Sequence, residues 1–319
     1  MRTHTCGELR SSDVNSDATV CGWVNTFRDQ GKGLVFIDIR DRTGLTQAVF
    51  DQEDCEAEVM ELARSLRRED VVQIGGRVDP REGGKNPKLD TGEIEIRGTA
   101  LKVFSRSNNP PILPDDHEAS KIAEDVRLRH RYIDLRRPTM QRTLQMRHDL
   151  STLTREYFHN LGFLEVETPL LIKSTPEGAR DFIVPSRVYP GKWYALPQSP
   201  QIFKQILMIA GCDRYMQICK CLRDEDPRAD RQAEFTQIDL EMSFVDRDEI
   251  IKIMTGFVRR VFKQLLGLDL GQIPKIPWQL ALDKWGADRP DMRFELHLQD
   301  ISAIAAKTDF KVFQSALAK

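Results

Sequence analysis

The sequence lacks a long apolar run. None of its hydrophobic stretches approaches the roughly 18 residues that a membrane-spanning helix needs. The N-terminal segment MRTHTCGELR is polar and has no hydrophobic core of a signal peptide. Internal repeats and low-complexity tracts are also missing. These absences predict a cytoplasmic chain that makes no membrane contact.

The chain also lacks a Cys-x-x-Cys pair. Its cysteines are unevenly spaced, and no histidine lies near the pair formed by Cys219 and Cys221. A structural zinc site is therefore not expected. Two interpretations of the pair stay open: it lines the active face of a strand, or it packs as two small apolar groups. Unpaired thiols of this kind are typical of a reducing cytoplasm.

A large net charge is missing as well. Charged residues make up 30% of the chain, but the net charge is only -2. Any contact with nucleic acid must therefore depend on local patches of basic residues. The length of 319 residues indicates about two domains.

Residues 18–104 show five strand-like segments, with one helical segment after the third. This is the element order of an OB-fold barrel, a fold that binds oligonucleotides. In the second segment Val35, Ile37 and Ile39 form an apolar face, and Phe36 falls on the other face. An aromatic ring among charges suits stacking on an unpaired base. The alternative, that Phe36 closes one end of the barrel, stays open.

Residues 107–140 combine prolines and acids with a basic run, which predicts a linker or hinge. The run either meets a phosphate backbone or forms salt bridges on a solvated helix. Its members are Arg127, Arg129, Arg131, Arg136 and Arg137.

Two helical segments follow. Residues 141–162 carry one apolar stripe, made of Met146, Leu150, Leu153, Tyr157 and Leu161. Residues 193–211 predict a strand, a turn and an amphipathic helix with Ser199 as its N-cap. Gln201 and Lys204 project from one side of that helix, where Lys204 is suited to bind a small carboxylate. An ordinary surface lysine is the alternative.

Residues 215–244 are the segment around which the rest of the chain is organised. They predict two antiparallel strands joined by a charged loop. From 234 onward the residues alternate, so that Ile238, Leu240, Met242 and Phe244 share one face and Gln237, Asp239, Glu241 and Ser243 share the other. Arg223 and Glu225 join this second face if the strands pair. Such a face suits a triphosphate, a metal and a cationic substrate. A solvated face with surface ion pairs is the alternative.

Four segments together resemble one family. CLRDEDPRADRQAEFTQIDLE resembles motif 2 of the class II aminoacyl-tRNA synthetases, and the 141–162 helix followed by GFLEVETPLL resembles motif 1, their dimer interface. STPEGARDF and LPQSPQIFKQ are similar to the substrate loop and amino-acid site of bacterial-type aspartyl enzymes. CGWVNTFRDQGKGLVFIDIRD resembles their anticodon-binding domain.

The resemblance implies an α+β fold, in which an N-terminal five-stranded OB-fold β-barrel precedes part of a class II synthetase antiparallel sheet flanked by helices. The implied reaction activates aspartate with ATP and Mg²⁺ and charges tRNA(Asp). Whether tRNA(Asn) is a further acceptor stays open. A homodimer through motif 1 is also implied. The implied parts are an OB domain at 1–106, a linker at 107–140, a catalytic domain at 141–286 and the start of an inserted domain at 287–319.

The resemblance also implies site residues. Arg223 is the catalytic residue, which bridges the aspartate α-carboxylate and the α-phosphate. The aspartate site comprises Glu177, Gln201, Lys204, Arg223 and Asp239. The ATP site comprises Arg223, Asp224, Glu225 and Gln232. Phe36 and Gln47 contact the anticodon, and Glu241 is the metal ligand. Arg28, which lies near Phe36 in the sequence, is our own addition to the anticodon contacts, as a residue suited to phosphate.

One departure from the family pattern is the missing motif 3, a glycine-rich stretch with an arginine for the γ-phosphate. We therefore expect the N-terminal part of a longer enzyme, and we expect the isolated chain not to form adenylate at a useful rate. Two alternatives remain: a non-catalytic tRNA-binding relative, and an asparaginyl-type synthetase.

Overall fold

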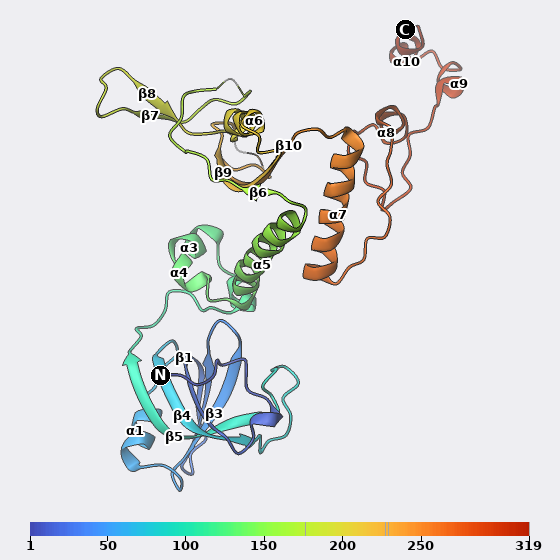
Figure 1. The fold of residues 1–319 in the computed structure, drawn as a ribbon. Coiled ribbons are helices and arrows are strands. Elements are labelled where there is room, and N and C mark those ends of the chain that lie inside the picture. The colour runs from blue at the N-terminus through green and yellow to red at the C-terminus, as the bar shows by residue number, and fades with distance from the viewer. Residues whose placement is uncertain (176, 227, 229, 319) are drawn as a thin grey trace. The chain divides into compact units, whose positions relative to one another are not determined.

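The computed structural model describes residues 1–175, 177–226, 228 and 230–318. The chain divides into two compact units, one from Met1 to Asp149 and one from Leu150 onward. Figure 1 shows the elements of both units. The long helix α5 (Pro138–Asn160) begins in the first unit and ends in the second.

The first unit contains a closed five-stranded barrel in the order β1-β2-β3-β5-β4. A short helix follows its third strand, as the sequence predicts, and a 3-10 turn, η1 (Ser11–Asp13), precedes the first. The bounds are β1 (Asp17–Asp29), β2 (Leu34–Arg40), β3 (Leu45–Asp51), α1 (Ala57–Arg64), β4 (Val71–Pro80) and β5 (Ile94–Ser105). Alternating side chains of these strands fill the barrel, among them Val35, Ile37 and Ile39, which are completely buried. The predicted OB-fold is confirmed.

Gly98 on β5 shows how tightly the barrel is filled. A Cβ atom at this position would lie 2.7 Å from the ring of Phe50, which is itself fully buried. Only glycine therefore lets this strand pass the ring at the observed distance.

The segment after the barrel folds into three short helices, α2 (Asp116–Ala119), α3 (Glu124–Arg129) and α4 (Arg131–Asp134). Three arginines of its basic run are held by acids. Arg131 and Arg137 both donate to Asp134, and Arg136 donates to Glu69 at 2.8 Å. The salt-bridge interpretation therefore describes these three side chains, and the phosphate interpretation does not.

Asp134 is fully buried between Arg131 and Arg137, and Arg137 also donates to Asp116 at 2.9 Å. Burial opposes the ionisation of Asp134. Hydrogen bonds and charge from Arg137 and Arg131 outweigh burial and lower the pKa of Asp134. We expect Asp134→Asn to lower the free energy of unfolding of the first unit by about 3 kcal/mol at neutral pH, because it breaks a buried ion pair. Urea denaturation measures this.

The sign of the pH dependence follows from the lowered pKa. A carboxylate of this kind contributes stability above its unfolded pKa, about 3.9, and loses it as the pH falls through the folded pKa. The difference in the free energy of unfolding between wild type and Asp134→Asn should therefore disappear in acid. Asp125→Asn, at an exposed position of α3, is the matched control and should change stability little. A difference that is constant with pH would contradict the prediction.

The second unit is built on a three-stranded sheet in the order β10-β9-β6, made of β6 (Leu164–Glu165), β9 (Arg214–Leu222) and β10 (Glu234–Met242). β9 and β10 are antiparallel, as predicted, but β6 pairs with β9 in parallel, so the sheet is mixed. A two-stranded hairpin, β7 (Ile183–Pro185) with β8 (Trp193–Ala195), stands beside it. The other helices are α6 (Gln201–Ile209), α7 (Arg247–Leu266), α8 (Trp278–Trp285), α9 (Ser302–Ala305) and α10 (Lys311–Leu317).

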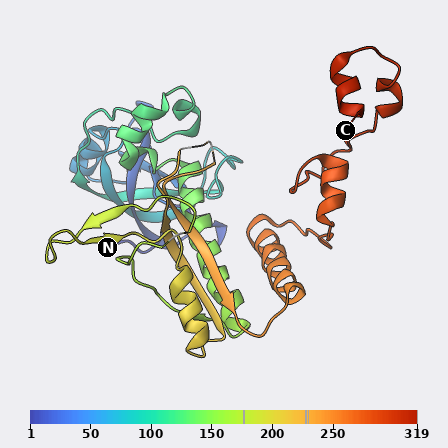
Figure 2. The same ribbon diagram turned by 90° about the horizontal axis from the view of Figure 1, so that it is seen from above.

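One face of this sheet is apolar and packs against α5 and α7. Its core joins Leu153 and Phe158 of α5, Met216 of β9, and Ile253 and Phe257 of α7. The rings of Phe158 and Phe257 lie 5.1 Å apart. Because these helices cover the apolar face, the opposite face of β9 and β10 is left for α6, which runs alongside β10 in Figure 2.

Three sequence predictions at the edges of elements are wrong. Phe244 is not on the apolar face, because β10 ends at Met242 and Phe244 is 98% exposed with a φ of 58°. Met146 is 45% exposed and does not join the core contacted by the rest of its stripe. The N-cap of α6 is Pro200, and Ser199 donates its hydroxyl to Glu177 instead.

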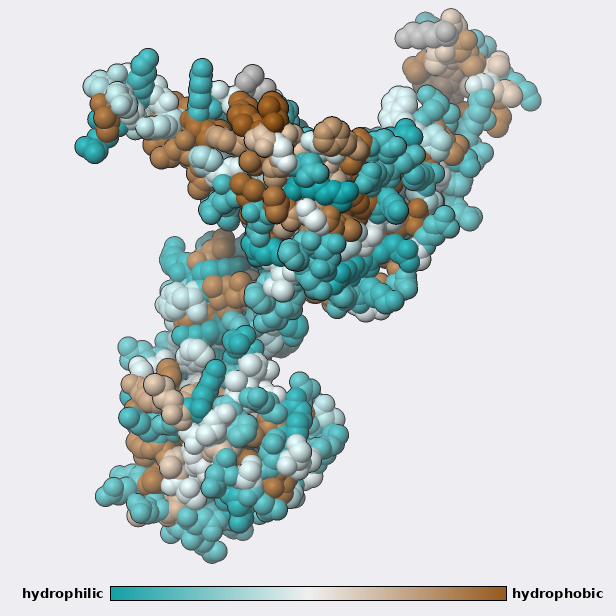
Figure 3. Space-filling model, viewed as in Figure 1, coloured by the Kyte–Doolittle hydropathy of each residue, from teal (hydrophilic) through white to brown (hydrophobic). Residues whose placement is uncertain are grey.

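The outward side of α6 is apolar and uncovered in the part of the chain that the structure describes. Ile202, Ile206 and Ile209 are 46%, 52% and 87% exposed, and hydrophobic surface marks this region in Figure 3. No helix among the described residues is long and apolar enough to span a bilayer.

Candidate active site

The face of β9 and β10 away from the apolar core carries the polar side chains, and we call it the polar face. The antiparallel register places Gln217 opposite Asp239, Cys219 opposite Gln237 and Tyr215 opposite Glu241. Because side chains alternate along a strand, these residues all point to the same side. The predicted face therefore forms, and α6 lies over it.

Lys204 reaches from α6 to this face. Its ammonium lies 2.8 Å from Asp239 Oδ1 and 3.3 Å from Glu241 Oε2. Burial by itself lowers the pKa of Lys204, but the hydrogen bonds and charges of the two carboxylates outweigh burial and raise it. Burial raises the pKa of Asp239, and Lys204 offsets only part of that rise. The lysine is therefore a cation held in place by carboxylates, not a free surface lysine.

Two polar atoms of this face are buried without a hydrogen-bond partner, namely Arg223 Nε and Asp239 Oδ2. The Arg223 guanidinium carbon lies 5.1 Å from the centre of the Phe235 ring, which fixes the side chain over that ring. An unpaired buried donor or acceptor costs about 1–3 kcal/mol. A ligand with an anionic group near Arg223 and a cationic group near Asp239 would remove both costs.

Glu177 is held beside α6 by two hydroxyl groups. Thr175 donates to its Oε1 at 2.9 Å and Ser199 donates to its Oε2 at 2.6 Å. Gln198, which is 1% exposed, joins the same loop by hydrogen bonds to the backbone of Ala179. The loop glutamate is thus positioned by a network of hydrogen bonds. Its negative charge opposes ionisation of the Cys221 thiol on the polar face.

The predicted ATP residues lie where the strands separate. Arg223, Glu225 and Gln232 line a hollow of about 450 Å³ whose floor includes Phe235. Glu225 accepts from Arg231 at 3.2 Å, and the backbone of Asp224 pairs with that of Arg180. Gln232 is exposed, and Gln201 is half-buried in the first turn of α6. Arg223 is therefore shared between this hollow and the polar face.

No group of three or more histidine, cysteine, aspartate or glutamate side chains suited to a metal ion occurs among the described residues. Glu241, the predicted metal ligand, is half-buried and uses Oε2 to contact Lys204. Mg²⁺ in nucleotide sites typically takes one or two carboxylates together with phosphate oxygens. The remaining oxygen of Glu241 suits such a partial site.

The predicted anticodon residues meet on the outside of the barrel. Arg28 pairs with Phe36 across β1 and β2, and its guanidinium carbon lies 5.8 Å from the ring centre. Phe36 is half-buried and is not part of the barrel core. Gln47 is only 3% exposed, and its amide already contacts Arg28, Arg81 and Glu95. A base edge reaching Gln47 would have to replace one of these contacts.

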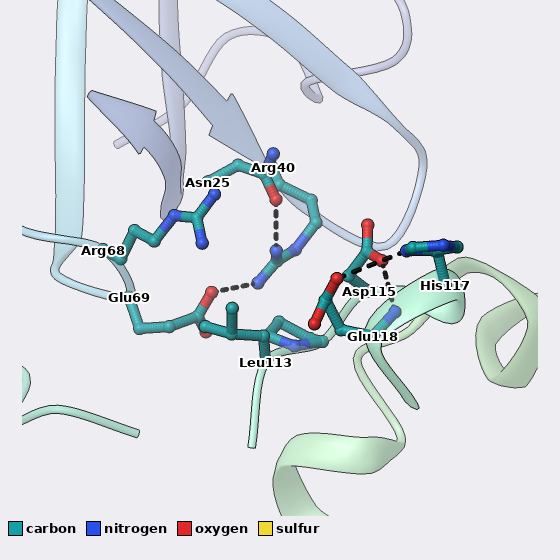
Figure 4. Close-up of a pocket in the computed structure, with 9 residues that line it drawn as sticks. Asn25, Arg40, Arg68, Glu69, Leu113, Asp115, His117 and Glu118 are labelled. Carbon is teal, nitrogen blue, oxygen red and sulfur yellow. Dashed lines mark hydrogen bonds and ion pairs between the residues drawn. The ribbon is translucent and has the colours of Figure 1, made fainter. Parts of the chain in front are cut away.

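Another hollow, which lies in the first unit and is drawn in Figure 4, is not suited to phosphate. Arg40 in its wall is neutralised by Glu69 at 2.7 Å, and both are buried. Asp115 and Glu118 add negative charge to the same wall and outweigh the one further arginine, Arg68. We therefore assign no anion site there.

Sequence reasoning missed the residues that support the site. Phe235 beneath Arg223, and Thr175, Gln198 and Ser199 around the loop glutamate, were not predicted to act there. Period-two alternation was a usable signal for Phe235, because it places that ring on the face of Asp239. No local pattern marks the other three, because their contacts cross from one loop to another.

The fold and the site point to a class of protein, because an OB-fold barrel precedes a sheet whose polar face carries buried charged side chains. The family description "OB-fold nucleic acid binding domain" matches residues 18–104, and "tRNA synthetases class II (D, K and N)" matches residues 123–314. The chain therefore belongs to the class II tRNA synthetases of the D, K and N group.

Named relatives agree with this assignment. The chain is 53% identical to the aspartate–tRNA(Asp/Asn) ligase of Thermoanaerobacter sp. (strain X514) over 99% of its own length and 53% of the relative's. It is 51% identical to the Rhodopirellula baltica protein of the same name, over 98% of this chain and 53% of that protein. The chain thus spans about half the length of the curated relatives it matches.

Among solved structures, the chain is similar to the asparaginyl-tRNA synthetase from Pyrococcus horikoshii complexed with asparaginyl-adenylate. The TM-score is 0.73 and the identity 26%, over 83% of this chain and 58% of that one.

Proposed function

We propose that this chain carries the aspartate-activating face and the anticodon-binding barrel of an aspartate–tRNA ligase. The single observation that carries the proposal is the pair of unpartnered buried atoms, Arg223 Nε and Asp239 Oδ2, on the face that also holds Lys204. An aspartyl group joined to AMP offers an anion, an ammonium and a side-chain carboxylate, which are the complements of these three residues.

The proposed reaction has two steps. An oxygen of the aspartate α-carboxylate attacks the α-phosphorus of ATP, the bond to pyrophosphate breaks, and aspartyl-adenylate forms. A ribose hydroxyl at the tRNA 3′ end then attacks the aspartyl carbonyl carbon, and AMP leaves. Both reactants of the first step are anionic, so a forked cation that contacts both offsets their repulsion and aligns them. Arg223 has this role.

The other residues bind and orient the substrate. Asp239 and Glu177 accept from the substrate ammonium, and Lys204 donates to the side-chain carboxylate with Gln201 beside it. Asp224, Glu225 and Gln232 contact ATP, with Glu225 accepting from the adenine amino group. Mg²⁺, held by Glu241 and phosphate oxygens, would supply charge neutralisation at the phosphates.

Lys204 favours aspartate over asparagine. A neutral amide at the side-chain position would leave the buried ammonium without its third partner, and a polar site left unpaired rejects such an analogue strongly. This charge disfavours the asparaginyl alternative within the family. We extend the proposal to tRNA(Asp) and tRNA(Asn) as acceptors, and to a homodimer through α5 and residues 162–171, where Leu164, Leu170 and Leu171 are exposed.

Hydrogen–deuterium exchange tests where the adenylate binds. A non-hydrolysable aspartyl-adenylate analogue should protect peptides from α6, β9 and β10, and it should leave the strands of the barrel unchanged. Protection confined to the barrel, or no protection anywhere, would overturn the proposed site.

The barrel gives a separate prediction. Phe36→Ala should weaken binding of a tRNA(Asp) transcript about 10- to 100-fold, because stacking on an aromatic ring is worth about 1–3 kcal/mol per base. Phe104→Ala is the matched control, since Phe104 is a 47% exposed ring on β5 with a lysine over it. Filter binding at fixed salt measures both variants. Equal losses in the two would contradict a specific role for Phe36.

A further inference from the structure

We propose that Gln198 is a positioning residue, which holds the loop that carries Glu177 where this glutamate meets the ammonium of the substrate. The side chain of Gln198 is 1% exposed, and its amide is hydrogen-bonded to loop residues 179 and 181. It therefore acts through the loop and not on the substrate itself. The inference rests on the proposed function, in which Glu177 accepts a hydrogen bond from that ammonium.

The amide of Gln198 is matched to the backbone of one loop residue. Its Oε1 accepts from the Ala179 N–H at 3.0 Å, and its Nε2 donates to the Ala179 carbonyl oxygen at 2.9 Å. The same Nε2 donates to Asp181 Oδ1. Because a side-chain amide offers one oxygen acceptor and two N–H donors, every part of the group is used. The reverse orientation would set donor against donor at Ala179, so the contact fixes the amide as well as the loop.

Side-chain packing does not hold this part of the loop. Gly178, which lies between Glu177 and Ala179, has a φ of 108°, and a Cβ atom built there would meet no atom within 4 Å beyond its chain neighbours. A glycine in open space restrains the backbone little. The position of Glu177 must therefore be set by hydrogen bonds, and Gln198 supplies those nearest to it on the C-terminal side.

Neighbouring contacts complete the support. Ser199, the residue after Gln198, donates to Glu177 Oε2 at 2.6 Å. The Asp224 N–H donates to the Arg180 carbonyl oxygen at 3.0 Å, which ties the loop to the segment after β9. Two consecutive residues thus hold the two parts of the loop, since Gln198 binds its backbone and Ser199 binds its carboxylate.

Asp181 gives the amide a charged acceptor. Ser174 donates to Asp181 Oδ2, and the hydrogen bonds from Ser174 and Gln198 lower the pKa of Asp181. A hydrogen bond to an ionised group is stronger than one between neutral groups. Gln198 is therefore held to the loop by a neutral pair of bonds at Ala179 and a charge-assisted bond at Asp181.

A purely structural amide is the alternative role, and the two roles predict different losses of affinity. Removal of a structural amide weakens every ligand of the polar face to the same extent. Removal of a positioning amide displaces Glu177, so it weakens only ligands that carry an ammonium for this glutamate to accept from.

Calorimetric titration of the whole chain separates the two roles with two non-hydrolysable ligands, the aspartyl-adenylate analogue and the same compound without its α-amino group. Gln198→Met keeps a side chain of similar length and removes the hydrogen bonds to Ala179 and Asp181. The wild type should prefer the ligand with the ammonium. We expect Gln198→Met to lower that preference about tenfold, because one charge-assisted hydrogen bond is weakened. Gln205→Met, the same change at an exposed position of α6, is the matched control and should keep the wild-type preference.

Hydrogen–deuterium exchange without ligand tests the loop separately from the proposed function. Peptides covering residues 177–182 should exchange faster in Gln198→Met than in the wild type. Ser174→Ala, at an exposed position, removes one donor to Asp181 and is a milder second variant if Gln198→Met does not fold. It should change the preference and the exchange in the same direction, by less.

Equal losses of affinity for the two ligands, an unchanged preference, or the same loss in Gln205→Met would overturn the positioning role of Gln198. A wild-type chain without any preference for the ammonium would overturn the proposed aspartate site instead. Faster exchange in Gln198→Met would then still show that Gln198 holds the loop.

Discussion

Replacing Arg223 with alanine should lower the affinity of the chain for a non-hydrolysable aspartyl-adenylate analogue about 100-fold or more. The guanidinium of Arg223 is fixed over Phe235, and its Nε is buried without a partner. Charge-assisted hydrogen bonds are worth about 1.5–3 kcal/mol each, and a forked arginine forms two of them with a carboxylate or phosphate. Isothermal titration calorimetry measures the change.

Two controls define this result. Arg223→Lys keeps the charge but loses the fork, so it should give an intermediate affinity. Arg247→Ala removes an arginine whose side chain is 85% exposed at the start of α7, and it should bind as wild type does. If Arg223→Ala retains wild-type affinity, or if Arg247→Ala loses as much, Arg223 does not grip the adenylate.

The second large effect concerns stability. Lys204→Met should lower the free energy of unfolding of the second unit by about 3 kcal/mol, because removing one partner leaves a buried charge uncompensated. Asp239 is 5% exposed and would lose its cationic partner, while Glu241, a group of the same charge, stays nearby. Urea denaturation measures the change in the unfolding transition of the second unit. Asp134→Asn, a change in the first unit, should leave that transition unaltered.

The double variant shows whether the charge is the cause. Lys204→Met with Asp239→Asn removes both buried charges, so it should recover much of the lost stability, as an apolar or neutral replacement of a buried pair typically does. Losses that simply add in the double variant would show that the contact between Lys204 and Asp239 has no coupling energy, and would contradict the prediction.

The sequence predicted the parts of this protein that repeat with a regular period. The barrel strands and the faces of β9 and β10 follow from alternation, because one side of each strand is buried and the other is not. Helix position suggested a carboxylate for Lys204, but its assignment to aspartate and the role of Glu177 came from the family resemblance. A single lysine or loop glutamate belongs to no local sequence pattern. Only the structure shows that Asp239 contacts Lys204 and that Ser199 donates to Glu177.

Features that depend on contacts between distant segments were not predictable from the sequence. The parallel pairing of β6 with β9 joins two segments far apart in the sequence, and the amide of Gln47 contacts Glu95 from another strand. Phe244 continues the alternation of β10 in sequence, but the strand stops before it. The distance of 3.7 Å between the sulfur atoms of Cys219 and Cys221 depends on side-chain rotation, which periodicity does not specify.

The most direct test of the central claim is a calorimetric titration that compares the aspartyl-adenylate analogue with its asparaginyl counterpart on the same chain. Because the two ligands differ only at the group that Lys204 is proposed to bind, we expect the aspartyl form to bind at least about 100-fold more tightly. Equal affinities, or a preference for the asparaginyl form, would contradict the assignment of the polar face to aspartate.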